Sequence, residues 1–339
     1  MQINLLGYPL PALKKLFEEH GFSALDAKRV YPWIHNKLSF SFAEMSDLPA
    51  AVRPQLAEKF SLSRGECERL QISEDGTRKA LLKFSDGNLI ETVFIPEATR
   101  NTICVSSQVG CAMGCKFCHT GTQNFTRNLS ASEILAQVFF WKDLFSISNI
   151  VFMGMGEPML NAANLFDALT ILLDNKTHNF SRHKITVSTC GIVCDQLNEL
   201  AKFGVKLAIS LHAPNDKIRS TIMPINSKFK IVEVLEAAKK YQKASNTERI
   251  TFEYLMLNGI NDSAGHAKEL VKLLHGLPAK VNLIKYNDWA GSQFKGSSTE
   301  KINAFSVQLT KHGLQATVRK SKGDDILAAC GQLKAKNNA

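Results

Sequence analysis

The sequence predicts an α/β protein: a partial barrel of six β/α units with a small helical domain before it. Short apolar runs, typical of buried strands, alternate with amphipathic stretches of helical length, the pattern of a parallel sheet covered by helices. Before residue 75, apolar side chains instead recur at helical spacing. The six predicted strands are residues 103–106, 150–153, 185–188, 207–210, 250–255 and 281–284. We also expect a last strand at 316–319 and a short helix from about residue 324.

Two apolar runs, 80–84 and 89–95, flank Ser85-Asp86-Gly87-Asn88 and predict a β-hairpin between the helical domain and the barrel. The chain thus divides into four predicted segments: a helical accessory domain (1–75), a hairpin linker (76–99), a core (100–334) and a polar tail (335–339).

The composition is that of a soluble globular protein, with 45% hydrophobic and 21% charged residues among 339. No signal peptide or membrane span is readable near the start, so we expect a cytoplasmic protein without membrane association. In that reducing compartment its eight cysteines are expected to act as ligands, catalysts or core residues rather than as a disulfide framework. The formal net charge of +10 favours a polyanionic partner such as nucleic acid.

Cys111, Cys115 and Cys118 form a C-x3-C-x2-C triplet directly after the first predicted strand, where β/α barrels place their active sites. Four-iron clusters bind cysteine thiolates, and three of them would leave one iron open to a small molecule. Two alternatives remain: merely buried thiols, or zinc, which would need a fourth ligand. His119 adjoins the triplet, but no second C-x2-C pair lies nearby.

The second predicted strand ends in Met-Gly-Met-Gly-Glu-Pro (153–158), where glycines let the backbone approach a ligand beside the Glu157 carboxylate. Alone, this segment could be an ordinary turn. With the cysteine triplet it resembles the radical S-adenosylmethionine (SAM) superfamily over residues 100–333. The resemblance implies that the triplet holds a [4Fe-4S] cluster. It also implies that SAM chelates the open iron and is cleaved by one electron to a 5′-deoxyadenosyl radical.

Further strings resemble one branch of that superfamily, the radical SAM adenine-C2 RNA methyltransferases (RlmN/Cfr family), over nearly the whole chain. They are Cys-Val-Ser-Ser-Gln-Val-Gly-Cys (104–111), Arg-Asn-Leu (127–129), Ser-Thr-Cys-Gly (188–191), Ile-Ser-Leu-His-Ala-Pro-Asn (209–215) and Gly-Asp-Asp-Ile-Leu-Ala-Ala-Cys-Gly (323–331). One departure is Lys-Tyr-Asn-Asp-Trp (285–289), where prolines are expected next to the Asn. It puts the shape of that loop in doubt.

The resemblance implies a catalytic role for three residues. Cys330 would take a methyl group from one SAM, becoming S-methylcysteine, and after radical formation from a second SAM would add to C2 of the adenine. Cys104 would then attack the Cys330 sulfur, release the base and leave a transient disulfide. Glu91 matches the proposed acceptor of the C2 proton, although from sequence alone it could equally be a solvated carboxylate on a strand face.

Residue-by-residue matching also implies a SAM site. Its residues are Gly156, Glu157, Ser188, Ser210, His212 and Asn287. His212 could instead be a structural histidine. The other cysteines, Cys67, Cys190 and Cys194, are expected to be small buried core residues.

The implied substrates are adenosine 2503 of 23S rRNA and adenosine 37 of some tRNAs, with the helical domain as an accessory RNA-binding unit. We expect a monomer that receives electrons from a donor such as flavodoxin or ferredoxin. Candidate phosphate contacts are Lys14, Lys15, Lys28, Arg29, Arg127, Lys295 and Arg319. Two rival functions remain: a C8-adenine 23S rRNA methyltransferase of the same family, and a nucleic-acid-binding protein with a non-catalytic iron–sulfur cluster.

Overall fold

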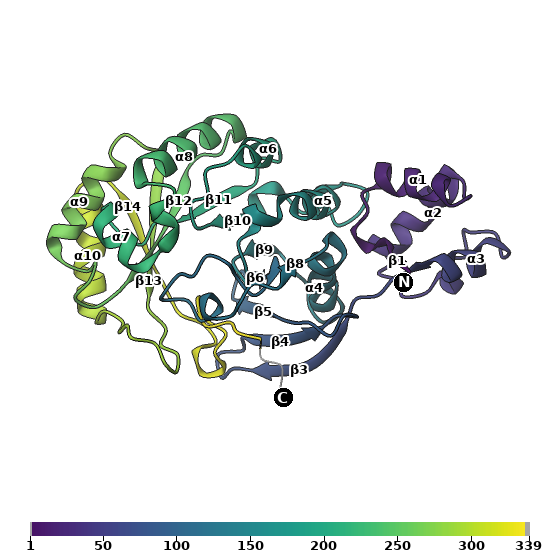
Figure 1. Ribbon diagram of the computed structural model, residues 1–339, viewed down its shortest axis with the longest axis horizontal. Helices are drawn as coiled ribbons and strands as arrows, with labels where there is room; N and C mark the ends of the chain where they lie inside the picture. Colours follow the sequence, from purple (N-terminus) through teal and green to yellow (C-terminus); the bar gives the residue numbers. More distant parts are fainter. Residues whose placement is uncertain (1, 336–339) are drawn as a thin grey trace.

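A curved ten-stranded sheet forms the centre of the protein, as seen in a computed structural model that describes residues 2–335 (Figure 1). The strands follow the order β14-β13-β12-β11-β10-β9-β6-β5-β4-β3. From β6 to β14 every pairing is parallel, whereas β3, β4 and β5 extend the sheet in antiparallel fashion. The parallel segment, which does not close on itself, is the predicted partial barrel.

All six predicted strands of the barrel are confirmed to within three residues at their ends, and the expected last strand is confirmed as β14. The parallel strands are β6 (Arg100–Cys104), β9 (Asn149–Phe152), β10 (Ile185–Thr189), β11 (Lys206–Ser210), β12 (Ile250–Met256), β13 (Ala279–Lys285) and β14 (Gln315–Arg319). Their centres are apolar on both faces, as in Leu207, Ala208 and Ile209 of β11, because helices cover one face and the barrel interior the other.

Helices of the barrel connect these strands and lie on its outer face (Figure 1). They are α4 (Ala131–Leu144), α5 (Ala162–Leu173), α6 (Gln196–Lys202), α7 (Asp216–Ile222), α8 (Ile231–Ser245), α9 (Ala264–Leu274) and α10 (Thr299–Lys311). Several begin at a side-chain cap. At the start of α4, for example, Ser130 and Glu133 form a capping box that satisfies backbone N–H groups of the first turn.

The antiparallel extension contains the predicted hairpin, β4 (Arg78–Lys83) and β5 (Leu89–Glu97), and a strand that the sequence did not predict, β3 (Glu66–Ile72). The expectation of helical structure up to residue 75 is therefore wrong over β3. This edge strand is mostly exposed and lacks the apolar alternation that would reveal it. Cys67 lies on it and is exposed, so the expectation that this thiol is buried is also wrong.

The N-terminal part forms a helical module beside α4 and α5 (Figure 1). It consists of β1 (Ile3–Asn4), η1 (Leu5–Gly7), α1 (Leu10–Glu19), α2 (Ala24–His35), η2 (Phe42–Glu44), α3 (Val52–Lys59) and β2 (Phe60–Ser61), with β1 and β2 paired in parallel. At Gly7 the backbone N–H donates to Ser132 Oγ at 2.9 Å, and a Cβ atom would lie 2.4 Å from the Ser132 backbone nitrogen. Glycine thus permits the closest approach between the module and α4.

Polar contacts also attach the module to the barrel. Arg64 pairs with Asp143 of α4 at 2.6 Å, and the Asn36 amide donates to the Lys176 carbonyl at 2.7 Å. The apolar side chains of module and barrel form one continuous core. The division into the four segments proposed from the sequence stays a prediction, and residues 336–339 of the expected tail lie outside the described part.

Short elements complete the fold: η3 (Thr120–Thr122), η4 (Pro158–Asn161), η5 (Arg182–Lys184), η6 (Pro224–Ser227), η7 (Asp324–Ile326) and the pair β7 (Gln108–Val109) and β8 (Arg127–Asn128). The helix expected from residue 324 is thus a single 3-10 turn. Among residues 2–335, no helix combines the length and apolar character needed to cross a bilayer.

His35, at the end of α2, is fully buried where the module meets the barrel. Its ring packs against Tyr31, Phe139 and His178, with ring centroids 4.6, 5.8 and 5.6 Å away. Neither ring nitrogen has a hydrogen-bond partner within residues 2–335. Burial, and to a smaller extent the charge of Lys142, lowers the pKa of His35 to about 3.

We therefore expect His35 to make the stability of the protein depend on pH. Its pKa is lower in the folded than in the unfolded chain, so its contribution is complete above about pH 6.5 and is lost as the pH falls towards 3. Replacing it by Phe should remove about 1.4 kcal/mol per pH unit from the slope of unfolding free energy in that window. Urea unfolding at pH 4.5, 5.5 and 6.5 measures this slope. An identical slope in wild type and His35→Phe would contradict the prediction.

Candidate active site

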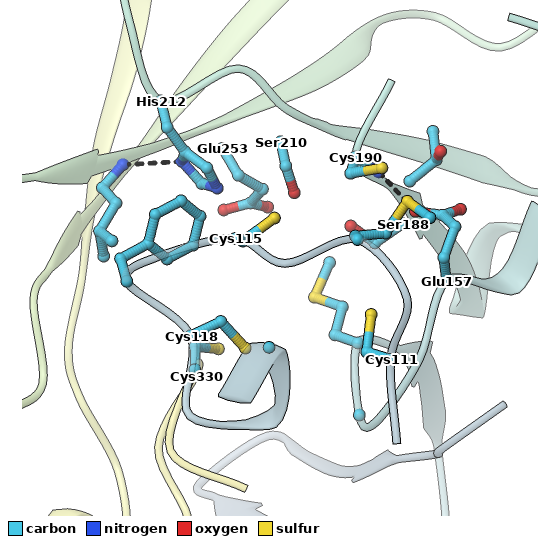
Figure 2. Close-up of a pocket in the computed structure, with 18 of the residues that line it drawn as sticks. Cys111, Cys115, Cys118, Glu157, Ser188, Cys190, Ser210, His212, Glu253 and Cys330 are labelled. Atoms are coloured by element: carbon cyan, nitrogen blue, oxygen red, sulfur yellow. Dashed lines mark hydrogen bonds between the residues drawn. The ribbon is translucent and has the colours of Figure 1, made fainter. Parts of the chain in front are cut away.

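A cavity of about 160 Å³ lies at the carboxyl ends of the parallel strands (Figure 2). On the same measure a single water needs about 10–15 Å³, so the cavity accommodates a much larger ligand. Its wall includes Ser210 and Arg319, the last residues of β11 and β14, and Met153, which follows β9. Cys330, from the C-terminal segment, faces the same space. The cavity occupies the place where β/α barrels form active sites.

All three cysteines of the predicted triplet line this cavity and are free thiols. Burial is the main cause that raises their pKa values, to about 11 for Cys111 and well above the usual value for Cys115. The thiols of Cys111 and Cys118 are electrostatic neighbours of Cys115 and raise its pKa further. Burial disfavours the charged thiolate form of these cysteines. A strong positive charge beside them, such as that of an iron cluster, is needed to stabilise the thiolates.

Gly154, Gly156 and Glu157 occupy the wall after β9, where the sequence predicted them. A Cβ atom at Gly156 would lie 2.5 Å from Gln108 Cβ, and its φ of +95° belongs to the left-handed region. Gln108 also accepts a hydrogen bond from the Glu157 N–H at 2.8 Å. Glycine is therefore required for the tight turn that presents Glu157 to the cavity.

The Glu157 carboxylate is oriented by two backbone N–H groups. Met159 donates to Oε1 at 3.0 Å, and Cys190 donates to Oε2 at 2.7 Å. Glu157 and Cys190 lie side by side in Figure 2. Burial nevertheless raises the pKa of Glu157. Cys190, expected to be a core residue, is buried, but it also lines the cavity. Cys194 is half-buried, which only partly agrees with the same expectation.

Ser188, Ser210 and His212 also line the cavity, with Ser188 beside Glu157 and His212 on the far side from it (Figure 2). His212 Nδ1 accepts a hydrogen bond from the Leu255 N–H at 3.0 Å, and its ring contacts Phe117 edge-on with centroids 4.8 Å apart. Burial lowers its pKa to about 3, so the ring is neutral and carries its proton on Nε2. His212 is therefore structurally fixed and also lines the cavity, while its contact with SAM stays a prediction.

Arg219 of α7 supports this wall from behind, a function that the sequence did not reveal. The side chain is fully buried, and Nη2 donates to the carbonyls of Cys190 at 2.6 Å and Ser210 at 3.2 Å. Nε donates to the Leu211 carbonyl at 3.2 Å, and Nη1 donates to Asn226 Oδ1 at 2.9 Å. One guanidinium thus joins the ends of β10 and β11.

Cys330 lies next to Cys118 because the C-terminal segment binds the loop of the triplet (Figure 2). The His119 N–H donates to the Gly331 carbonyl at 2.6 Å, and Thr120 Oγ1 donates to the Leu333 carbonyl at 2.5 Å. The His119 ring also stacks on Trp289, at 4.6 Å between centroids. These contacts connect the triplet to a residue more than 200 positions later.

Cys104 is buried behind the cavity wall at the end of β6, and Cys330 is its electrostatic neighbour. Burial raises the pKa of Cys104 to about 12. Arg319 faces both cysteines, and its own pKa is raised, chiefly by Cys330. Arg319, a candidate phosphate contact, lines the cavity, and whether it contacts RNA stays a prediction. Both cysteines are free thiols in this structure.

Two other predicted site residues do not line the cavity. Asn287 lies under the Cys330 segment, where Nδ2 donates to the Cys330 carbonyl at 3.4 Å and Oδ1 accepts from Ser321 at 2.6 Å. Glu91, on β5, is only 2% exposed and pairs with Lys79 of β4 at 3.0 Å. The alternative that Glu91 is a solvated carboxylate is therefore wrong.

The structure also shows the surroundings of another candidate phosphate contact. Arg127, a candidate phosphate contact, pairs with Asp86 at 2.6 Å and Glu133 at 2.7 Å in this structure.

The sequence did not reveal Glu253, which lines the cavity and is buried. It lies inside β12 in an otherwise apolar run, and the signal that could have identified it is this single acid within a predicted strand.

Comparisons with known proteins agree with this geometry. The family model for the Radical SAM superfamily matches residues 105–273, and that for the ribosomal RNA large subunit methyltransferase N-terminal domain matches residues 3–62. A dual-specificity RNA methyltransferase RlmN from Roseobacter denitrificans is 43% identical over 98% of this chain and 89% of its own length. The RlmN of Rhodospirillum rubrum is 45% identical over 98% of this chain and 80% of its own length. The chain belongs to the RlmN family.

A solved structure supports the family at the level of the fold. The crystal structure of a radical SAM methyltransferase from Sphaerobacter thermophilus is 40% identical and superimposes with a TM-score of 0.92, covering 98% of this chain and all of that one. As a member of the radical SAM superfamily, the protein uses a [4Fe-4S] cluster and SAM.

The residues present fit that cofactor. Residues 2–335 contain no group of three or more His, Cys, Asp or Glu placed to hold a single metal ion. A four-iron cluster, in contrast, takes each thiolate on a different iron, so its ligands need not converge on one point. Three thiols that face one cavity, which Glu157 and two serines also line, match a cluster with SAM beside it.

We expect Arg219→Met to destabilise the protein and weaken SAM binding together, because it frees the carbonyls of Cys190 and Ser210 in the wall. Each buried carbonyl left unpaired costs about 1–3 kcal/mol, so the loss should be about 3 kcal/mol or more. Urea unfolding and calorimetric titration with SAM measure the two effects. Arg182→Met, at an exposed arginine, is the control and should change stability by less than about 0.5 kcal/mol. Unchanged SAM affinity in a folded Arg219→Met variant would contradict the expectation.

Proposed function

We propose that this protein methylates C2 of adenine in RNA, at adenosine 2503 of 23S rRNA and adenosine 37 of some tRNAs, through an S-methylcysteine at Cys330. The observation that carries the proposal is that Cys330 opens into the same cavity as the cysteine triplet. Its relatives at 43–45% identity are named dual-specificity RNA methyltransferases, which favours C2 over the C8 alternative.

The cluster and SAM, when bound, supply the methyl group and a carbon-centred radical. In our proposal Cys111, Cys115 and Cys118 hold the cluster, and the SAM site comprises Gly156, Glu157, Ser188, Ser210 and His212. We also propose that Asn287 contacts the adenine or ribose of SAM, although in this structure its side chain bonds to the Cys330 carbonyl and to Ser321 and does not line the cavity.

Cys330 is the nucleophile and methyl carrier in this proposal. Its sulfur takes the methyl group of SAM and loses its thiol proton. Arg319 faces this sulfur, and displacement of a methyl group from SAM needs a thiolate. The S-methyl group of Cys330 would lose one hydrogen atom to the carbon-centred radical, and the resulting methylene would form a carbon–carbon bond with C2 of the adenine.

Cys104 completes the proposed cycle. Its thiolate attacks the Cys330 sulfur, so that a sulfur–sulfur bond forms while the sulfur–carbon bond to the product breaks. Two thiols are thereby oxidised to a disulfide, and an external thiol reductant must restore them. Burial raises the pKa of Cys104, and Arg319 opposes this effect.

Glu91 is our proposed acceptor of the C2 proton. In this structure the carboxylate is held by Lys79 and by the N–H of Lys334, outside the cavity wall. Acting as a base therefore requires Glu91 to exchange one of these contacts for the C2 proton. For partners, we propose 23S rRNA and tRNA bound with help from the N-terminal module, a monomeric enzyme in the cytoplasm, and an electron donor such as flavodoxin or ferredoxin.

The test is anaerobic incubation of the reconstituted protein with methyl-labelled SAM, dithionite and unmodified 23S rRNA fragment or tRNA. Mass spectrometry of the digested RNA should find labelled 2-methyladenosine. Labelled 8-methyladenosine would place the protein in the C8 branch. No label despite an intact cluster would support the non-catalytic alternative.

Two cysteine variants test the proposed roles. Cys330→Ala should abolish the product because the methyl carrier is gone. Cys104→Ala should instead trap protein covalently joined to RNA, seen as a shifted band on a denaturing gel, because the sulfur–carbon bond is not broken. Cys67→Ala, at an exposed thiol on β3, is the control and should turn over normally. Turnover by Cys104→Ala without any crosslink would refute its role.

A further inference from the structure

The segment that carries Cys330 is attached at both of its ends to one buried ion pair. Lys79 Nζ donates to the Leu327 carbonyl at 3.2 Å, three residues before Cys330. Glu91 Oε2 accepts the N–H of Lys334 at 2.8 Å, four residues after it. Lys79 and Glu91 contact each other at 3.0 Å, so both ends of the segment from 327 to 334 bond to the same ion pair.

This pair is rigidly placed. Lys79 of β4 is opposite Val93 of β5, and Glu91 is opposite Leu81, so the two charged side chains are diagonal neighbours in one antiparallel ladder. Their side chains are 7% and 3% exposed, which excludes most solvent screening. The ladder gives the pair a fixed position relative to β6 and Cys104, because β5 also pairs with β6.

The segment itself has little regular structure to hold it. It follows η7 and contains neither a helix nor a strand among its described residues, and Leu327 and Gly331 have φ values of +53° and +82°. Such a segment depends on tertiary contacts for its conformation. Close to Cys330 these contacts include the 3.4 Å bond from Asn287 to its carbonyl and the bond from His119 to Gly331.

We propose that Lys79 is a positioning residue whose ammonium, paired with Glu91, clamps the Cys330 segment and so sets the place of the reactive sulfur. The inference rests on the proposed function in that Cys330 is the methyl carrier. Lys79 does not line the cavity, so it acts through the segment and not on the substrate.

The backbone groups at the two ends of the Cys330 segment explain why charged side chains lie at positions 79 and 91. One end presents a carbonyl, which needs a donor, and the other presents an N–H, which needs an acceptor. An ammonium has several donors and can serve both Glu91 and Leu327. A carboxylate has two oxygens, and Glu91 uses Oε1 for Lys79 and Oε2 for Lys334.

The test compares Lys79→Met with a matched variant, Lys83→Met, in the full-length protein carrying its cluster. Lys83 lies on the same strand and pairs with Glu68 at the same 3.0 Å, but that pair is about half exposed and contacts no part of the Cys330 segment. Peptide-resolved hydrogen exchange should be about tenfold faster over residues 327–334 in Lys79→Met, the loss expected for a hydrogen bond to a charged group. Lys83→Met should leave this exchange unchanged.

Kinetics and a conservative variant separate positioning from general damage. In Lys79→Met, kcat for RNA methylation should fall while KM for SAM stays the same, since Lys79 is outside the cavity. Lys79→Arg, which keeps the charge and the donors, should restore slow exchange and most of kcat. Should Lys79→Met fail to fold, Lys79→Met with Glu91→Gln, which removes both charges, is measured in its place by hydrogen exchange alone, because Glu91 is the proposed proton acceptor.

Unchanged exchange over 327–334 in a folded variant lacking Lys79 would overturn the proposal, as would failure of Lys79→Arg to restore it. The exchange measurement does not require turnover. If wild type makes no methylated RNA, the proposed function fails, while fast exchange in Lys79→Met still shows that the clamp exists.

Discussion

The hydrogen bond from the His119 N–H to the Gly331 carbonyl is the contact on which the site depends. The triplet follows β6 and Cys330 follows β14, and these strands are not neighbours in the sheet. Strand register can therefore align each of them with the barrel mouth, but cannot bring the two together. Bonds from the triplet loop to the C-terminal segment do so, and they place Cys330 beside Cys118 and Cys104.

Desolvation is the common physical condition of the residues gathered there. Burial raises the pKa values of Cys104, Cys111 and Glu157 and lowers that of His212, so the isolated site favours neutral groups. Positive charge comes from Arg319, from Arg219 or from a bound cofactor. A polar group that ionises in such a site is strongly affected by each neighbouring charge, and cofactor binding and the ionisation of the cysteines are therefore coupled.

The sequence revealed the parts of this protein that have strong local signals. Buried parallel strands are continuous apolar runs, and the triplet has a spacing that is rare by chance, so both were predictable. The edge strand β3 carries no such pattern, and Cys67 on it was assigned to the core on residue type alone. The positions of Arg319 and Arg219 in the structure could not be predicted from the sequence for another reason. Whether an arginine is a surface charge or a buried support depends on which carbonyls and thiols the fold brings to it.

The buried environment of Glu91 could not be predicted from the sequence either, and its pairing with Lys79 needs a physical explanation. A buried ion pair such as Lys79 with Glu91 contributes little net stability compared with apolar side chains of the same size, because both charges lose their hydration. Stability alone therefore does not account for charges at this place between β4 and β5. An apolar pair could fill the space but could neither donate to the Leu327 carbonyl nor accept from the Lys334 N–H. The antiparallel strands beside the barrel thus supply the side chains that bond to both ends of the Cys330 segment.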